Sequence, residues 1–170
     1  HSQNSHDSEC PVAEMAKAAD INNLSGFAVT DHCDIGFCNS IDISTTVQSS
    51  VADAEITNNN STLTVLKGVE IGEAFWFPKA AATILSENDF DVVIGSVHAV
   101  KFKDYDMPYS QINFAELGIN ASNQYFDKYL DDMITMINTC DFDILAHLTC
   151  PLRYINGKYG MGLSCKDYIA

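Results

Sequence analysis

Four short apolar runs in this sequence each end on a residue type that binds metals. The runs are GFAVTDH, LTVLKGVE, DVVIGSVH and FDILAH, and they end on His32, Glu70, His98 and His147. Runs of this length and composition are typical of buried β-strands. In parallel α/β barrels the C-terminal ends of successive strands open onto one face, where chemistry is placed. The pattern therefore predicts that four potential ligands converge on one mouth.

Helical patterns alternate with these strand patterns along the chain. Amphipathic spacing predicts helices from Pro11 to about Asn22 and over 43–56, 78–85 and 125–137, and strands over 26–31, 63–70, 91–97 and 142–146. Long loops are expected over 32–42 and 99–121. The alternation predicts one domain of the α/β class, with a parallel sheet or barrel.

Composition and charge narrow the possible partners. The 170 residues are 46% hydrophobic and 19% charged, which is typical of an ordinary globular domain. Nine basic residues against 23 acidic ones give a net charge of −14, so we expect neither a nucleic acid nor an anionic membrane as partner. No apolar run approaches the roughly 20 residues that span a bilayer.

The cysteines favour a reduced, cytoplasmic protein. The six lie at positions 10, 33, 38, 140, 150 and 165, and no pair has C-x-x-C spacing. In a domain of this size scattered thiols are more often reduced than joined in a disulfide framework. Cys33 directly follows His32 and is expected to be a small hydrophobe beside the site rather than a ligand.

Each strand-end residue also has a structural alternative. A lone histidine at a strand end is more often a hydrogen-bonded structural residue than a ligand. Four potential ligands at four consecutive strand ends are improbable by chance, so the set predicts a metal site. Imidazole and carboxylate groups without a thiolate pattern suit Zn, Mn or Fe, and their number indicates two or three ions. A multinuclear site of this kind is typical of a hydrolase.

Ordered motifs then carry a family resemblance. They are HSQNSHDS at 1–8, TDH at 30–32, GVEIGE at 68–73, IGSVH at 94–98 and LAHL at 145–148. Over nearly its whole length the chain resembles the polymerase and histidinol phosphatase (PHP) superfamily. The segments GSVHAV, GVEIGE and HLTCPLRY most resemble the histidinol-phosphate phosphatase branch. The resemblance implies a distorted (β/α)7 TIM-like barrel with its metal centre at the C-terminal face.

The resemblance also implies how much of that barrel the chain holds. The first histidine of the family's H-x-H motif would precede residue 1, and the closing D-x-H motif has no counterpart before Ala170. We therefore expect residues 1–170 to form a partial PHP domain, truncated at both ends, with about five βα units of the barrel.

The resemblance assigns a ligand set. His1 matches the second histidine of H-x-H and Asp7 the ligand that follows it, while Glu70 is the expected bridge between two ions. The implied metal ligands are His1, Asp7, His32, Glu70, His98 and His147. They would hold two or three divalent ions, Zn, Mn or Fe. His6 matches no ligand position and is expected to be a loop histidine near the mouth.

The implied reaction is hydrolysis of a small phosphate monoester by water activated at the metal centre. In the closest branch the substrate is L-histidinol phosphate, which belongs to histidine biosynthesis. Asp31 is expected to orient His32 or to shuttle a proton. Arg153, six residues after His147, is the candidate phosphate clamp, and the alternative for it is a surface ion pair.

Two other functions stay open. The chain could be another PHP phosphoesterase, acting on nucleotides, DNA ends or other phosphoesters, which a basic groove would favour. It could also be a non-catalytic, metal-binding remnant, if the native polypeptide is no longer than these 170 residues.

Overall fold

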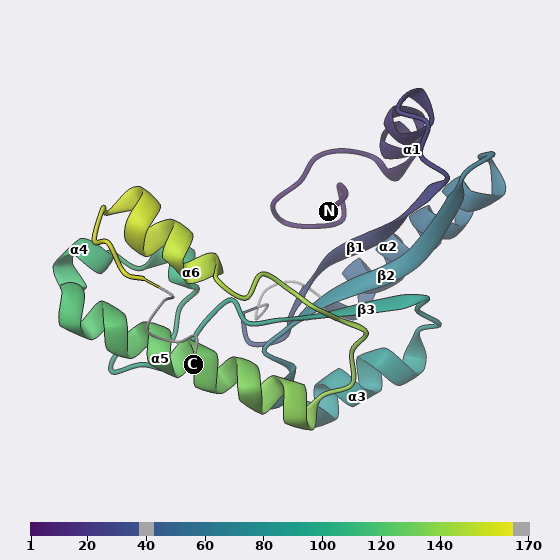
Figure 1. Ribbon diagram of the computed structural model, residues 1–170. Helices are drawn as coiled ribbons and strands as arrows, with labels where there is room; N and C mark the ends of the chain where they lie inside the picture. The colour runs from purple at the N-terminus through teal and green to yellow at the C-terminus, as the bar shows by residue number, and fades with distance from the viewer. Residues whose placement is uncertain (38–42, 165–170) are drawn as a thin grey trace.

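The computed structural model describes residues 1–37 and 43–164, and its four strands are all parallel (Figure 1). They are β1 (Gly26–Asp34), β2 (Thr64–Gly72), β3 (Val92–Ser96) and β4 (Ile144–Leu145), in the order β1-β2-β3-β4. Each lies where an apolar run predicted a strand, which confirms the α/β class. Against the expected number of about five βα units, the described residues form four strands.

The helices follow the predicted alternation. The longer ones are α1 (Val12–Ile21), α2 (Ile43–Asn59), α3 (Pro78–Glu87) and α5 (Ile119–Thr139). Pro78 begins α3, where its fixed backbone angle suits the first turn and its missing N–H is not needed. Helix α2 ends later than predicted: it continues past Ile56 to Asn59, three residues into the polar run. Within 99–121, expected to be a loop, the chain makes two short helical segments and begins α5.

Five short helical segments complete the described structure. They are η1 (Ala74–Trp76), η2 (Tyr109–Gln111), α4 (Phe114–Leu117), α6 (Cys150–Leu152) and the π-helical η3 (Arg153–Lys158). Except for α4, each follows closely on a segment that carries a predicted ligand. They therefore line or border the C-terminal side of the sheet.

One face of α5 forms the largest part of the core. Tyr125, Tyr129, Met133 and Met136 recur at helical spacing and are at most 1% exposed, packed with Val97 and Val100 of the chain beyond β3. Ile137, which directly follows Met136, is 51% exposed and lies off this face. Because the buried face of α5 packs against the chain on both sides of His98, it supports the position of that residue.

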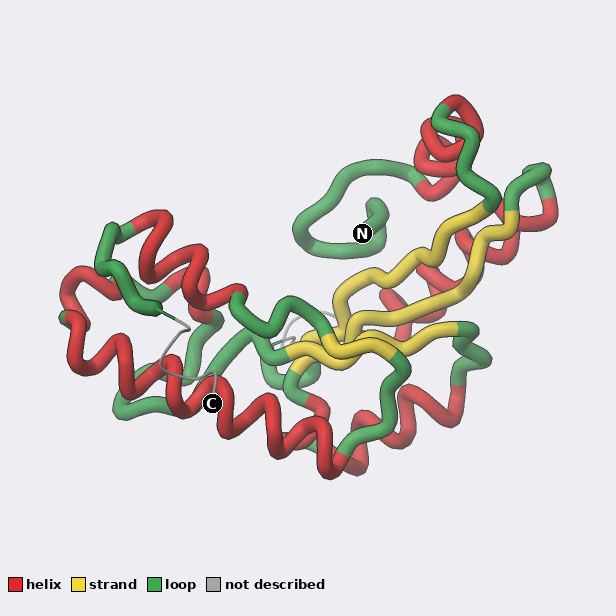
Figure 2. Tube along the Cα trace, viewed as in Figure 1, coloured by secondary structure: helices red, strands yellow, loops and turns green. Residues whose placement is uncertain are grey.

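The N-terminal loop lies over the sheet. Figure 2 shows the chain before α1 curling back so that its first residues lie above the strands. The β1 strand extends to Asp34, so His32 lies within the strand rather than just after it. Ligands from the loop and from the strands can therefore meet.

No described helix combines the length and the apolar character needed to cross a membrane. No disulfide joins the four cysteines that the structure describes, Cys10, Cys33, Cys140 and Cys150. Cys38 and Cys165 lie outside the described residues. Cys33 is buried against Val69 and Ile71, as expected for a small hydrophobe beside the site.

Candidate metal centre

The register of β1 and β2 creates the first part of the site. His32 lies directly opposite Glu70, and Asp34 lies opposite Gly72. Alternate residues of a strand share a face, so His32 and Asp34 point to the same side. A Cβ atom on Gly72 would lie 2.4 Å from Asp34 Oδ1. Glycine at this position leaves room for the Asp34 carboxylate to reach His98 on the far side of β2.

Glu70 lies at the centre of the cluster and is 5% exposed. Its Oε2 is 3.1 Å from His1 Nε2, while its Oε1 is 2.9 Å from His98 Nε2 and 3.1 Å from His147 Nε2. The two oxygens of one carboxylate thus face two separate groups of imidazole nitrogens. This geometry suits a carboxylate that bridges two ions.

The N-terminal loop adds His1 and Asp7. His1 Nδ1 lies 3.0 Å from Asp7 Oδ1, and Asp7 Oδ2 lies 3.5 Å from His32 Nε2. The His1 and His32 rings meet edge to face with their centroids 4.1 Å apart. His6 is exposed, but its ring lies 4.9 Å from that of His32, so this loop residue also borders the cluster.

These side chains fall into three overlapping sets that could each hold an ion. The sets are His1, His32 and Glu70; His32, Asp34 and His98; and Glu70, His98 and His147, with the ligand atoms of each within 4.8 Å of one another. Nitrogen and carboxylate donors without thiolate suit Zn, Mn or Fe. The buried Nδ1 of His32 makes no hydrogen bond to the described residues, so a bound ion or water would satisfy it. The donor set therefore fits a multinuclear centre.

Asp34 belongs to the site although the sequence analysis did not identify it. Its Oδ1 lies 2.8 Å from His98 Nδ1 and 3.6 Å from His32 Nδ1. The bond to Nδ1 leaves Nε2 of His98 directed at Glu70, which is how a carboxylate commonly orients a metal-binding histidine. The available signal was its position two residues after His32 in a strand, which places it on the same face.

Glu73 is a second carboxylate that sequence reasoning missed. It is fully buried, and its Oε1 accepts hydrogen bonds from the backbone N–H groups of His98 and Ala99. Burial raises the pKa of Glu73 to about 7, and its Oε2 has no hydrogen-bond partner among the described residues. The hydrogen bonds that His98 donates to Glu73 and Asp34 together hold both its backbone and its ring. Glu73 ends the GVEIGE motif, which was the signal in the sequence.

Carboxylates around the imidazoles shift the titration of the cluster. The hydrogen bond with Glu70 raises the pKa of His1 to about 9, although burial opposes it. Burial lowers the pKa of His98, but the bonds with Asp34 and Glu70 outweigh it and raise that pKa to about 10. Burial raises the pKa of Glu70, but its bonds from the histidines outweigh this and hold that pKa well below its usual range.

These raised pKa values predict that metal binding depends on pH. Without metal, His1 and His98 are protonated at neutral pH, with pKa values of about 9 and about 10. A ligand histidine must be neutral, so each ring releases a proton when an ion binds. We expect affinity for Zn to rise from about pH 6 to about pH 9, by about tenfold per pH unit for each proton released. Competition with a chelator across this range measures the slope, and a slope of zero would contradict the assignment of both rings as ligands.

The structure places Asp31 away from the cluster. Because strand residues alternate, its side chain lies on the opposite face of β1 from His32. Its carboxylate accepts hydrogen bonds from Ser2 and Ser50, and it makes none to the His32 ring. Asp31 is thus next to His32 in sequence, and its hydrogen bonds from Ser2 connect it to the N-terminal loop that carries His1 and Asp7.

Arg153 also lies off the cluster. It is exposed at the start of η3, and no ion pair to it occurs within the described residues. Its neighbour Tyr154, with Cys150, lines a cavity that the predicted ligands also line. The structure therefore brings together the six predicted ligands and leaves Arg153 outside the residues that line their cavity.

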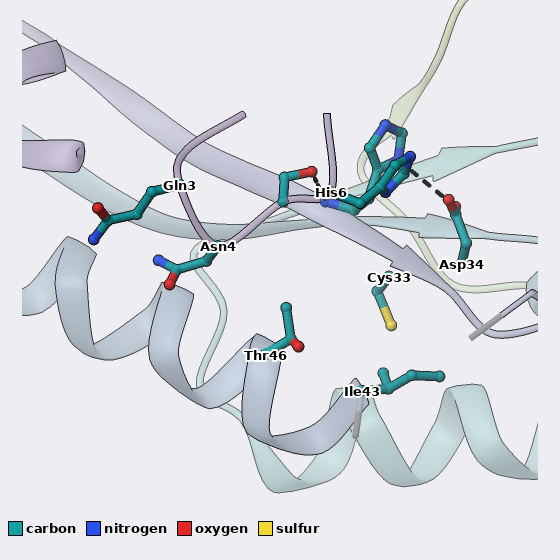
Figure 3. Close-up of a pocket in the computed structure, with 9 residues that line it drawn as sticks. Gln3, Asn4, His6, Cys33, Asp34, Ile43 and Thr46 are labelled. Atoms are coloured by element: carbon teal, nitrogen blue, oxygen red, sulfur yellow. Dashed lines mark hydrogen bonds and ion pairs between the residues drawn. The ribbon is translucent and has the colours of Figure 1, made fainter. Parts of the chain in front are cut away.

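Two of the cavities formed by the described residues are lined by His32 and Asp34 of the cluster. The larger, about 350 Å³, has the metal ligands on one side and, on the other, Pro108, Tyr109, Ser110, Gln111, Cys150 and Tyr154. The smaller, about 260 Å³, lies between the N-terminal loop and α2. Figure 3 shows Gln3, Asn4 and His6 of the loop around it, with Ile43 and Thr46 of α2 below. The larger cavity, open to the ligands, has the space for a small substrate.

Comparisons with known proteins agree with this geometry. The family model described as PHP domain matches residues 1–168. No significant match was found among curated proteins. A solved structure with the same fold is the histidinol phosphate phosphatase from Lactococcus lactis subsp. lactis Il1403, complexed with zinc, L-histidinol and phosphate. It has a TM-score of 0.67 and 23% sequence identity, and the match covers 90% of this chain. This chain spans 57% of that protein's chain.

Proposed function

Because the chain belongs to the PHP domain family, we propose that it acts as a metal-dependent phosphoesterase on a small phosphate monoester. The observation that carries the proposal is the convergence of His1, Asp7, His32, Glu70, His98 and His147 on one cavity. Two or three divalent ions bound there would supply Lewis-acid stabilisation of the phosphoryl oxygens and an activated water.

The chain's own residues would prepare this chemistry in stated ways. Glu70 presents one oxygen to His1 and the other to His98 and His147, so it would help to hold metal together with each of these histidines. Asp34 keeps the proton of His98 on Nδ1 and leaves Nε2 free as a ligand. The cavity wall opposite the ligands would enclose the organic part of the substrate.

L-Histidinol phosphate is the substrate we propose, and with it a role in histidine biosynthesis. The structure of similar fold is a histidinol phosphate phosphatase complexed with L-histidinol and phosphate, which supports this choice. The Tyr109 and Tyr154 rings, with centroids 5.4 Å apart, line the cavity and could pack against an imidazole ring. Gln111 lines the same wall and offers an amide to a polar group.

Two other functions have less support. A phosphoesterase acting on DNA ends would need a basic groove, but no lysine or arginine is among the described residues that line the cavity, and the net charge is −14. A non-catalytic metal-binding protein would share the ligands but would not need an enclosing wall beside them. A measurement of substrate turnover distinguishes an enzyme from this non-catalytic protein.

The test is metal content together with phosphate release by the full-length protein. We expect two or three ions per chain by elemental analysis, and release of phosphate from L-histidinol phosphate that a chelator abolishes. A nucleoside monophosphate and 4-nitrophenyl phosphate serve as matched substrates. Faster release from the nucleotide would replace the proposed substrate, and metal without release from any of them would overturn the proposed activity.

Arg153 is our proposed phosphate contact. A guanidinium binds phosphate oxygens in bidentate fashion, and Arg153 directly precedes Tyr154, which lines the cavity. We expect Arg153→Ala to raise KM for the phosphate ester by about tenfold, as the loss of a charged hydrogen bond does. Lys158→Ala removes another exposed cation from the same short helix and should leave KM unchanged. Equal KM values for the two variants would show that Arg153 does not contact the phosphate and is a surface residue without a role in binding.

A further inference from the structure

Asp31 is buried among hydroxyl groups on the side of β1 away from the His32 ring. It is 4% exposed, and its Oδ2 accepts hydrogen bonds of 2.6 Å from both Ser2 Oγ and Ser50 Oγ. Its Oδ1 accepts a further bond from the backbone N–H of Ser2. Ser2 is itself fully buried. Two of the three hydrogen bonds that described residues donate to this carboxylate therefore come from one residue of the N-terminal loop.

That loop carries two of the predicted ligands. Besides the contact of His1 with Glu70, its hydrogen bonds to the described strands and helices involve Ser2, Gln3, Asn4 and Ser5. Ser2 directly follows His1, and the bond from Ser2 to Asp31 fixes the backbone beside the His1 ring. Elsewhere, Asn4 donates to the carboxylate of Asp53 at 2.9 Å in a half-buried position, and Gln3 donates to it at 3.2 Å on an exposed surface. Exposed bonds of this kind contribute little, whereas charge-assisted bonds to a buried carboxylate are among the strong ones.

We propose that Asp31 is a positioning residue that acts through Ser2 to hold the N-terminal loop in the conformation where His1 and Asp7 meet the other metal ligands. The inference rests on the proposed metal-dependent function and states how that site obtains its N-terminal ligands. It replaces a role for Asp31 in orienting His32 or moving a proton, since Asp31 does not touch that ring. Asp31 therefore affects the metal centre from the face of β1 opposite the His32 ring.

Two serines on the same oxygen make a matched pair of variants. Ser2→Ala and Ser50→Ala each remove one hydroxyl that donates to Asp31 Oδ2 at 2.6 Å, and both serines are buried. Only Ser2 belongs to the loop, whereas Ser50 lies in α2. A general loss of stability would affect both variants, while loss of the loop tether would affect only Ser2→Ala.

The first measurement is hydrogen exchange of the N-terminal loop in the metal-free, full-length protein. We expect exchange over residues 3–10 to be about tenfold faster in Ser2→Ala and Asp31→Asn than in the wild type, and unchanged in Ser50→Ala. Ser2→Thr keeps the hydroxyl and should restore protection. Equal exchange in Ser2→Ala and Ser50→Ala would overturn the proposal, whether or not the protein binds metal.

The second measurement is zinc binding. We expect Ser2→Ala to weaken the binding of one zinc ion by about tenfold. This ion is the one held by His1, His32 and Glu70, because the loop that carries His1 is no longer ordered. The ion at Glu70, His98 and His147 should be retained. Adding Asp31→Asn to Ser2→Ala should cause little further loss, since both act on the same bonds. A wild type without metal would overturn the proposed function alone. Normal zinc binding by Ser2→Ala would overturn the proposed role of Asp31 at the metal centre.

Discussion

Glu70→Gln is expected to lower phosphoesterase activity by about a thousandfold or more. It is also expected to remove metal from the two ion sets that contain Glu70. The Oε1 and Oε2 atoms of Glu70 each face a separate group of histidines, and a glutamine would keep only one oxygen with neutral charge. An amide nitrogen is not a ligand for these ions. The side chain keeps its size, so we expect the fold to persist. Elemental analysis and phosphate release measure the two losses, and circular dichroism checks the fold.

Glu87→Gln is the matched control for this change. Glu87 is exposed at the end of α3, away from the cavity. Its change to glutamine removes the same charge as Glu70→Gln does. We expect wild-type metal content and turnover in this variant. If Glu70→Gln retained both ions and its turnover, the metal mechanism proposed above would have to be abandoned.

His98→Ala is expected to reduce activity about a hundredfold or more, again with the fold retained. His98 takes part in two of the three possible ion sets, and its loss would also leave the buried Asp34 carboxylate without its 2.8 Å partner. Its side chain is 12% exposed, so truncation opens space towards the cavity rather than a closed void in the core. Zinc titration should show fewer ions per chain. Full zinc occupancy would show that His98 is not a ligand.

Substitutions at Asp34 test how His98 is held. Asp34→Asn keeps an oxygen that accepts from His98 Nδ1, whereas Asp34→Ala leaves the ring free to turn. If Asp34 orients the ring, we expect the alanine variant to lose about ten- to a hundredfold in metal affinity and the asparagine variant much less. Equal losses in the two variants would indicate that Asp34 binds an ion directly.

Much of the fold followed from local pattern. Short apolar runs between amphipathic segments predicted each of the four observed strands and the four longer helices, although α5 begins at Ile119, six residues before its predicted start at 125. The ends of α2 and β1 differed because helix and strand continue for as long as neighbouring backbone groups find partners, which local polarity does not decide. The resemblance to the PHP superfamily was confirmed by the match of its family model to residues 1–168.

The site was predictable where it depended on strand ends and not where it depended on side-chain direction. Glu70, His98 and His147 come together because the C-terminal ends of parallel strands share one edge. Asp31 and Asp34 lie three residues apart in one strand and so point to opposite faces. The pleat was the available signal that Asp34, and not Asp31, shares the face of His32.

The sequence by itself determined the order of strands and helices, the positions of the candidate ligands and the nitrogen and oxygen chemistry that they offer. These depend on backbone periodicity and on side-chain type, both of which are local. Only the tertiary structure decided that Asp34 reaches His98 across Gly72 and that Ser2 meets Asp31. It also decided that Tyr109 and Tyr154 share one cavity wall. Such contacts join residues far apart in the chain, and close packing of the whole fold sets their distances.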